Sequence, residues 1–440
     1  MKEDSRHAEE TLKKNPSPSK LRRLRLRLAP SGSVLDRRFR QFNDLLAKVR
    51  CSAIKAQLSR RLFPFFARQS NWLPLSLNPT NYPAIKAQVQ NILAERRENQ
   101  PILLFPPSLD WNTQLFQRPQ QLALAFARQG AFVFYFQPPP YPRRGSIEFI
   151  EERLLLCHFP IDVLSDLPSP FVYLLTWNRT FAQSLRTARI IYDYVDEIEA
   201  FSANTTKLHS EHERLLKDAQ LVITSAYQLY EQVIQYRTDA LLCPNGVDYE
   251  LFTMGDKSKL KTPPDMAPIS EFGRPIIGYY GALARWFDYA LMTKVASLRP
   301  DLSFVLIGPD YDSTLPPELL DMPNVYWLGV KPYHEIPIYL HHFDVAIIPF
   351  IVNEVTNAVS PLKLFEYMAA QKPVVITPMR ESSQYPGVLL ASTATEFAHQ
   401  LDKALNLRED TAYRALLKQL ALENTWQARA KQILKAVNQK

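Results

Sequence analysis

Short apolar runs alternate with segments of helical periodicity from about residue 100 onward. Runs that are apolar at nearly every position are typical of strands buried on both faces of a sheet. The first series of such runs covers residues 101–105, 131–136, 171–176, 189–195 and 220–226. A helical pattern covers residues 118–130 and ends at Gly130, a residue suited to a helix C-terminus. This strand–helix alternation predicts a parallel sheet with crossover helices.

A second series of apolar runs follows residues 255–268, a stretch rich in Pro and Lys that indicates a linker. These runs cover residues 275–281, 302–308, 325–329, 345–350 and 373–378. Two such series predict an α/β chain with two Rossmann-like domains facing a cleft, where ligands bind at the carboxyl ends of the strands. We expect an N-terminal extension at 1–98, a first domain at 99–255, a linker at 256–270, and a second domain with a closing C-terminal helix at 271–440.

The N-terminal extension has a different pattern. Residues 1–20 are polar and indicate a flexible tail. Apolar residues then recur at helical spacing, at Leu35, Phe39, Phe42, Leu46 and Val49, with arginines and lysines largely off this stripe. Two interpretations fit a basic amphipathic helix of this kind. It binds an anionic membrane surface through residues 20–66, or it packs on the body of the protein.

Charge is concentrated in the same extension. The chain has 440 residues and a net charge of +8, but residues 1–70 hold 18 Lys and Arg against 6 Asp and Glu. The remaining residues hold 34 against 38, so the body is not basic and we expect no nucleic-acid partner. Three widely spaced cysteines favour neither a metal site nor a disulfide framework, which suits a cytoplasmic protein. A polar N-terminus and the lack of an apolar run of about 18 residues predict neither a signal peptide nor a membrane span.

The segment 353–373 contains the richest candidate chemistry. Ser360 suits a helix N-cap and Pro361 suits the first helical position, with a helix running to about Ala370. The N-terminus of such a helix offers free N–H groups and a partial positive charge to a phosphate. Lys363 adds a full positive charge in the first turn, and Glu366 lies on the same face, where its carboxylate can accept hydrogen bonds from a ribose diol. The alternative is an ordinary surface ion pair between these two residues.

Four motifs together resemble one family. They are DWNTQLFQRPQQLA (110–123), PNGVD (244–248), IGYYGALARWFD (277–288) and SPLKLFEYMA (360–369). In this order they resemble bacterial glycosyltransferases of the GT-B fold, similar to family 4, over roughly residues 100–430. The resemblance implies transfer of a sugar from a nucleotide-sugar donor to a glycan or lipid-linked acceptor, in cell-surface polysaccharide synthesis and without a cofactor.

The resemblance also implies a donor site in the second domain. The helix carrying Lys363 and Glu366 is expected to bind the diphosphate and the ribose, and Gly281 to let the backbone approach the phosphates. Arg285 occupies about the place of a second phosphate ligand. The expected donor-binding set is completed by Ser360, Pro361, Leu362, Gly329, Val330 and Asn357.

One position departs from the family pattern. Many members carry two glutamates, and here Glu366 fills the second place while Ala358 stands in the first. The first carboxylate usually contacts the donor sugar, so the sugar and the stereochemical outcome stay open. Asn357 or Glu354 from the same loop is the candidate substitute.

Acceptor-side candidates lie in the first domain. Asp196, and after it Asp193, follow a predicted strand and suit a general base that takes the acceptor proton; helix capping is the alternative. Trp111 suits stacking on an acceptor sugar, and Arg118 suits contact with a diphosphate-lipid acceptor. For these two the alternatives are plain packing and the start of a helix.

A metal requirement is not expected. Asp310-Tyr311-Asp312 matches a metal-binding triplet of another glycosyltransferase fold, but here it follows Gly308-Pro309 and indicates a turn. Charge stabilisation would come from Lys363, Arg285 and a helix N-terminus instead. Two other functions compete with the enzyme: a non-catalytic nucleotide-sugar- or glycan-binding protein, and a membrane-recruited scaffold.

Overall fold

The computed structural model describes residues 82–113, 116–141, 145–200, 205–253 and 261–439. The amphipathic arm, including residues 20–66, lies outside the described residues, so its two interpretations both stand as predictions. The first described element is helix α5 (Tyr82–Leu93), in the last part of the expected extension.

The first domain is built on an eight-stranded sheet in the order β3-β4-β2-β1-β5-β6-β7-β8. The strands are β1 (Ile102–Phe105), β2 (Phe132–Phe136), β3 (Ile147–Glu151), β4 (Leu154–Cys157), β5 (Phe171–Leu174), β6 (Arg189–Tyr194), β7 (Leu221–Thr224) and β8 (Leu241–Leu242). All neighbours pair in parallel except β3, which is antiparallel to β4. The five expected strands are confirmed, and β3, β4 and β8 are additional. β3 escapes the apolar-run criterion because it is a partly exposed edge strand in which two glutamates interrupt the apolar residues.

The second domain is built on a six-stranded, fully parallel sheet in the order β11-β10-β9-β12-β13-β14. The strands are β9 (Ile276–Tyr280), β10 (Ser303–Ile307), β11 (Val325–Trp327), β12 (Val345–Ile348), β13 (Val374–Ile376) and β14 (Val388–Leu390). The five expected strands are again confirmed. Central strand β9 lies between β10 and β12, so residues after β9 lie at the middle of the carboxyl edge of this sheet.

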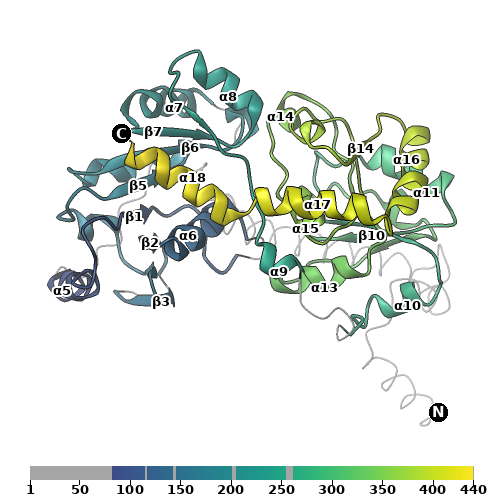
Figure 1. Cartoon of the computed structure of the whole chain (residues 1–440), viewed down its shortest axis with the longest axis horizontal. Helices are drawn as coiled ribbons and strands as arrows, with labels where there is room; N and C mark the ends of the chain where they lie inside the picture. The colour runs from purple at the N-terminus through teal and green to yellow at the C-terminus, as the bar shows by residue number, and fades with distance from the viewer. Residues whose placement is uncertain (1–81, 114–115, 142–144, 201–204, 254–260, 440) are drawn as a thin grey trace, which may run out of the picture. The chain divides into compact units, whose positions relative to one another are not determined.

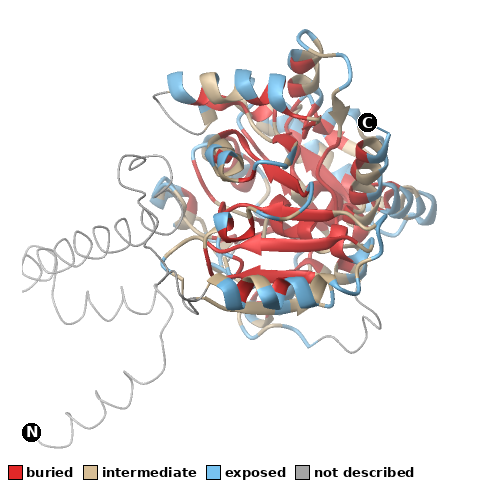
Figure 2. Ribbon diagram, turned by 90° about the vertical axis from the view of Figure 1, so that its left-hand side faces the viewer, coloured by how far each residue is buried: buried red, intermediate tan, exposed pale blue. Residues whose placement is uncertain are grey.

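Helices cover these sheets, and the central strands between them are buried (Figure 2). Those connecting the first sheet are α6 (Arg118–Arg128), η2 (Ile161–Leu164), η3 (Thr176–Ser184), η4 (Ile198–Ala200), α7 (Thr206–Asp218) and α8 (Tyr227–Ile234). The later helices are α9 (Tyr249–Thr253), α10 (Ala267–Ser270), α11 (Tyr289–Leu298), α12 (Pro317–Leu320), η6 (Tyr333–Glu335), α13 (Ile336–His341), α14 (Glu354–Asn357), α15 (Leu362–Ala369), η7 (Ser382–Gln384), α16 (Ala394–Leu407), α17 (Thr411–Glu423) and α18 (Trp426–Asn438).

Helix α6 shows how local sequence sets an element. It begins at Arg118, with Pro119 in its first turn, and ends at Arg128. Gly130 follows with a φ of 91°, and the amide of Ala131 donates to the carbonyl of Phe126. This left-handed closure satisfies carbonyls of the last turn, as the position of the glycine predicts.

The C-terminal helix α18 packs on the first domain. Its residues Trp426, Ala430, Ile433 and Val437 belong to the hydrophobic core of that domain, and α18 runs beside α6 (Figure 1). The expected boundaries assign this helix to the second domain. Sequence periodicity shows that a helix has a buried face, but it does not show which sheet that face covers. The chain therefore passes between the domains twice.

The two crossings are hydrogen-bonded to each other. The amide of Val247 donates to the carbonyl of Asn424 at 3.0 Å, and the amide of Trp426 donates to the carbonyl of Val247 at 3.2 Å. Between them Gly246 packs so closely that a Cβ there would lie 3.0 Å from the Asn424 carbonyl oxygen. This close pairing joins the two interdomain segments into one structural unit.

None of the helices in the described part of the chain combines the length and apolar composition that crossing a bilayer requires.

Candidate functional site

Two glycine turns lie at the carboxyl edge of the second sheet. Gly281 follows β9 with a φ of +132°, and Gly308 follows β10 with a φ of +140°. These φ values lie in a region that L side chains rarely adopt. A Cβ on Gly308 would lie 1.9 Å from the carbonyl oxygen of Gly281, so the two turns are in direct backbone contact.

Lys363 lies over the Gly281 turn. A Cβ on Gly281 would lie 2.9 Å from Lys363 Cε and 3.3 Å from its Nζ. The ammonium group lies 4.9 Å from the ring centroid of Phe350 and 5.4 Å from that of Tyr279. Among the described residues the structure records neither a hydrogen bond nor an ion pair for this lysine. Desolvation lowers its pKa to about 8, although the charge of Glu366 opposes that shift.

An unpaired ammonium group over a glycine turn is suited to an anion. The two aromatic faces give it a weak electrostatic attraction but no counter-charge. The turn offers backbone at close range because neither Gly281 nor Gly308 carries a side chain. A phosphate group bound here would restore the full positive charge of Lys363.

The helix that carries Lys363 starts later than expected. Helix α15 begins at Leu362 with Pro361 at the N-cap, and no side chain caps it. The expected N-cap, Ser360, has another role: its Oγ accepts a hydrogen bond from the amide of Asn245 at 3.1 Å. The first turn of α15 is thus left without a side-chain acceptor, which leaves its partial positive charge available to an anion. Leu362 packs against the core of the first domain.

Glu366 is buried beneath two tyrosines. Its Oε2 accepts a hydrogen bond from the hydroxyl of Tyr280, and its Oε1 accepts one from Tyr333 at 2.9 Å. The residue is only 2% exposed, and burial raises its pKa to about 7 against the opposing effect of the two tyrosine hydrogen bonds. A surface ion pair with Lys363 is therefore wrong. In this conformation two tyrosines occupy both carboxylate oxygens, so the expected contact with a ribose requires a change of conformation.

Tyr333 connects this carboxylate to the first domain. Its hydroxyl accepts a hydrogen bond from Gln121 Nε2 at 2.9 Å, and its ring stacks on Phe116 at 5.8 Å between centroids. Nothing in the local sequence pattern of Tyr280, Tyr333 and Gln121 marks them as partners of Glu366, so the sequence does not predict this network. The candidate residues before Tyr333 lie at open positions: no atom lies within 4 Å of a Cβ built on Gly329, and Val330 is 38% exposed.

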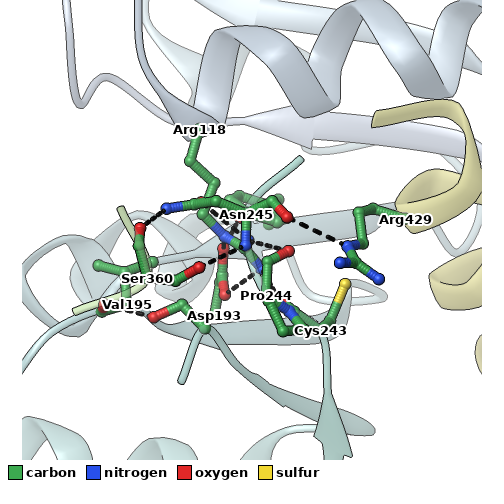
Figure 3. A network of polar contacts seen from close by, with 10 residues as sticks. Arg118, Asp193, Val195, Cys243, Pro244, Asn245, Ser360 and Arg429 are labelled. Atoms are coloured by element: carbon green, nitrogen blue, oxygen red, sulfur yellow. Dashed lines mark hydrogen bonds and ion pairs between the residues drawn. The ribbon is translucent and has the colours of Figure 1, made fainter. Parts of the chain in front are cut away.

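Arg118 and Asp193, two separate acceptor-side candidates, bind each other. Arg118 Nε donates to Asp193 Oδ2 at 2.6 Å, and its NH2 group donates to Oδ1 at 3.1 Å (Figure 3). Both are buried, and Asp193 also accepts a hydrogen bond from Tyr173. The interpretations of Arg118 as a diphosphate ligand and of Asp193 as a general base do not fit this geometry, because a buried, fully bonded pair has no atoms left for a substrate.

Trp111 is likewise a packing residue in this structure. Its ring meets Phe116 and Tyr135 edge-on at 5.3 and 5.1 Å, and it belongs to the core of the first domain. Its backbone amide donates to Gln137 Oε1 at 3.1 Å. Stacking on an acceptor sugar does not fit a ring held in this way.

Asp196 is the remaining acceptor-side candidate, and its surroundings differ. It follows β6 at the carboxyl edge of the first sheet and is half-buried. Desolvation, with a smaller repulsion from Asp193, raises its pKa to about 7. Within the described residues no hydrogen bond is recorded for its carboxylate. A carboxylate with few stabilising partners and a pKa near neutrality is suited to general base catalysis.

The Asp310–Asp312 triplet forms a turn, as expected. Asp310 Oδ1 accepts hydrogen bonds from the amides of Thr314 and Leu315, and Asp312 Oδ2 accepts one from the amide of Arg285. The side chain of Arg285 is exposed. Across the described ranges, no group of three or more His, Cys, Asp or Glu side chains is arranged to hold a metal ion.

The loop before α15 has no carboxylate at the position of the first family glutamate. Ala358 is fully buried there. Asn357 Oδ1 accepts a hydrogen bond from the amide of Arg380 at 3.0 Å, while Glu354 is exposed on α14. Their role as substitutes for the missing glutamate stays a prediction.

Comparison with known sequences gives one family and one relative. Residues 274–406 match the sequence model of the family described as Glycosyl transferases group 1. The chain is also 30% identical over 267 residues to the putative teichuronic acid biosynthesis glycosyltransferase TuaH of Bacillus subtilis (strain 168). That match spans 56% of this chain and 66% of the relative, just under two thirds of its length.

Solved structures share the fold at low identity. Sucrose-phosphate synthase from Thermosynechococcus elongatus has a TM-score of 0.56 at 16% identity, over 77% of this chain and 98% of that one. Anabaena HepE in complex with UDP has a TM-score of 0.55 at 15% identity, over 78% and 100%. The E. coli trehalose-6-phosphate structure bound with UDP-2-fluoro glucose has a TM-score of 0.59 at 12% identity, over 78% and 99%. The fold expected from the sequence, two Rossmann-like domains, is thereby confirmed.

Proposed function

Because residues 274–406 match the Glycosyl transferases group 1 family, we propose that this protein is a glycosyltransferase that uses a nucleotide-sugar donor. The acceptor is a glycan or a lipid-linked glycan, and the product serves cell-surface polysaccharide synthesis. The name of the Bacillus subtilis relative, with its teichuronic acid role, supports this choice of product class. Two neighbours of the same fold, solved with UDP and with a UDP-sugar, support the choice of donor.

One observation carries the proposal for the donor site: the unpaired ammonium group of Lys363 over the Gly281 turn. The diphosphate would lie against this turn and the uncapped start of α15. Lys363 then neutralises the charge that grows on the diphosphate as the glycosidic bond breaks. The exposed Arg285 adds a second cation at the same edge of the sheet. The chain thus supplies the charge stabilisation without a metal ion.

On the acceptor side we assign the base to Asp196. Its raised pKa lets it take the acceptor proton at neutral pH, and the recorded contacts leave its carboxylate unengaged. Asp193, by contrast, is paired with Arg118. For donor specificity, we place Gly329 and Val330 at the nucleoside and Asn357 near the sugar.

Thermal shift tests the donor proposal. A ligand that binds only the native state raises the melting temperature by mass action. We expect a shift with at least one of the UDP-, GDP- and dTDP-sugars, and none in Lys363→Ala. Wild-type protein that shifts with none of these ligands would contradict the proposal.

The buried Ala358 favours one competing function, a nucleotide-sugar-binding protein without turnover, because the donor sugar lacks its usual carboxylate contact. Hydrolysis of the bound nucleotide sugar separates the two. Slow release of free sugar by wild type but not by Lys363→Ala is expected of the enzyme. Binding without any release or transfer would favour the binding protein.

We further propose that residues 20–66 bring the enzyme to an anionic membrane on the cytoplasmic side, where a lipid-linked acceptor would lie. The basic amphipathic pattern of the sequence supports this. Co-sedimentation with anionic vesicles should fall as salt rises, since screening weakens surface attraction. Equal vesicle binding by full-length protein and protein lacking residues 1–70 would overturn the membrane role, and deletion should spare turnover on soluble acceptors.

A further inference from the structure

We propose that Asn245 is a positioning residue of the donor site, which fixes the start of helix α15 so that its uncapped turn and Lys363 face the diphosphate. The inference rests on the proposed function and adds a residue outside the expected donor set. Asn245 belongs to the PNGVD segment, at one of the two crossings between the domains.

Asn245 is bonded twice to the residue just before the N-cap of α15. Its backbone amide donates to Ser360 Oγ at 3.1 Å, and its side-chain Nδ2 donates to the Ser360 carbonyl at 2.6 Å (Figure 3). Both residues are buried, 7% and 3% exposed. Lys363 is only three residues further along, so the position of Ser360 sets the position of the first turn.

Arg118 determines which way the Asn245 amide points. An amide side chain has one accepting and one donating end, whereas a guanidinium group only donates. Arg118 NH1 donates to Asn245 Oδ1 at 3.2 Å, so the oxygen must face Arg118 and the NH2 group is left to face Ser360. The orientation of the Asn245 amide therefore follows from its hydrogen bonds.

Arg118 is itself held by several hydrogen bonds. Asp193 holds it through two hydrogen bonds, and it also donates to the carbonyls of Cys243 at 2.9 Å and Pro244 at 3.2 Å. The ion pair in the first domain thus acts on the donor helix of the second through a single side chain, Asn245. The buried Arg118–Asp193 pair cannot contact a substrate, and the positioning of Asn245 gives it a structural role.

The backbone of Asn245 is clamped as well. Arg429 Nε donates to its carbonyl at 3.3 Å, and Arg429 also donates to Asn424 Oδ1 on the second crossing. Next to it, Gly246 packs against that crossing without room for a side chain. Because this crossing is held by Arg429 and packs closely at Gly246, the hydrogen bonds to Ser360 join α15 to a well-anchored part of the first domain.

Asn245→Asp tests the inference with the least change in shape. It keeps an oxygen toward Arg118 and replaces the NH2 group by an oxygen that faces the Ser360 carbonyl, so attraction becomes repulsion. We expect the Kd for UDP, and the KM for the donor, to rise about tenfold to a hundredfold, as is typical of a misplacement of about 1 Å at an active site. The rise in Kd is the readout that a purely structural residue would not give.

Asn324→Asp is the matched control. Asn324 is also buried and donates through Nδ2 to backbone carbonyls, those of Ala296, Arg299 and Leu302, but at the amino end of β11. It should lower the melting temperature at least as much as Asn245→Asp and leave the Kd for UDP unchanged. Equal loss of affinity in both variants would overturn the inference, because general destabilisation would then explain it.

Ser360→Ala serves where the aspartate variant does not fold. It removes only the Oγ acceptor, and the Kd for UDP should rise about fivefold, the loss typical of one hydrogen bond. If folded Asn245→Asp or Ser360→Ala binds UDP as tightly as wild type while Lys363→Ala loses UDP binding, the positioning role of Asn245 is overturned. The proposed donor site would then still stand. Wild-type protein that binds none of UDP, GDP and dTDP would overturn the proposed function, and the inference with it.

Discussion

The hydroxyl of Tyr333 donates to Oε1 of Glu366 at 2.9 Å and covers the carboxylate to which we assign the donor ribose. Tyr280 occupies the other oxygen, Oε2. Tyr280 is part of central strand β9, whereas Tyr333 lies in the short helix η6 and is held from the other side by Gln121. Donor binding therefore requires Tyr333, rather than Tyr280, to leave Glu366, because the backbone of a central strand is fixed on both sides.

Tyr333→Phe should strengthen donor binding. The variant removes a hydrogen bond that the ribose has to replace, worth about 1 kcal/mol, so the Kd for UDP should fall about fivefold at pH 8. Gln121→Leu, which frees the tyrosine without touching Glu366, should act in the same direction. Calorimetric titration checks both. Weaker binding by Tyr333→Phe would mean that the hydroxyl contacts the donor.

Lys363 and Glu366 should separate catalysis from binding. Lys363→Ala removes a contact that strengthens in the transition state and should lower kcat by about a hundredfold to a thousandfold, roughly 3–4 kcal/mol, with a smaller rise in KM. Glu366→Ala should mainly raise KM, because the ribose changes little during the reaction. Steady-state kinetics with circular dichroism as the folding control measures both. Wild-type turnover in two folded variants would make α15 purely structural.

Donor affinity should be bell-shaped with pH. The pKa of Glu366 in the free protein is about 7, so binding to its carboxylate strengthens as pH rises toward 7. The pKa of Lys363 is about 8, and a bound diphosphate would raise it, so binding takes up a proton and weakens above pH 8, by up to about tenfold per pH unit. Calorimetry with UDP-glucose, which has no phosphate monoester to titrate, gives the profile.

Two variants test which residue causes the acidic limb and which the alkaline limb of this pH profile. Lys363→Arg should flatten the alkaline limb, because a guanidinium group stays charged up to about pH 12. Glu366→Gln should flatten the acidic limb. A profile that keeps both limbs in both variants would place the titrating groups elsewhere.

Asp193→Asn should destabilise the protein, whereas Asp196→Asn should inactivate it. The first leaves buried Arg118 without its counter-charge, at a cost of about 3–5 kcal/mol, and the melting temperature should fall by about 10 °C. The second should lower kcat by about a hundredfold to ten-thousandfold. Calorimetry and kinetics on both variants test this. Loss of turnover without loss of stability in Asp193→Asn would restore Asp193 as the base.

The stability of Asp196→Asn should also depend on pH in a defined way. The pKa of Asp196 is raised from 3.8 to about 7, so the folded state binds its proton more tightly than the unfolded state. Wild-type stability contributed by this group therefore falls as pH rises from about 4 to about 7. The asparagine variant lacks that fall, and its melting temperature relative to wild type should be higher at pH 8 than at pH 5.

EDTA should leave turnover nearly unchanged. In the proposed donor site, Lys363, Arg285 and the start of α15 would supply the positive charge at the diphosphate. Asp310 and Asp312 are engaged by backbone amides. An assay with and without added Mg²⁺ or Mn²⁺ decides. Activity that EDTA abolishes and either ion restores would return the Asp310–Asp312 turn to the site.

The sequence by itself determined most of the strands of the two sheets, and it placed the proposed donor site at the carboxyl edge of the second sheet. Apolar runs predicted ten strands because a strand buried on both faces needs apolar residues throughout. Lys363 was predicted from its place in the first turn of a helix, whereas Gly281 was implied by the family resemblance. The structure places them in contact.

Only the tertiary structure decided which polar side chains meet. Arg118 and Asp193 are 75 residues apart, and Tyr280 and Glu366 are 86 apart. The local sequence around Arg118 and Asp193 suggests substrate ligands, and that around Tyr280 suggests an ordinary strand. Neither pattern shows which side chain the residue will bind. The order of strands in each sheet brings these groups together. The periodicity of the sequence shows which face of a helix or strand is buried. The hydrogen-bond partners on that face depend on which other elements pack against it, and this is set by the tertiary structure.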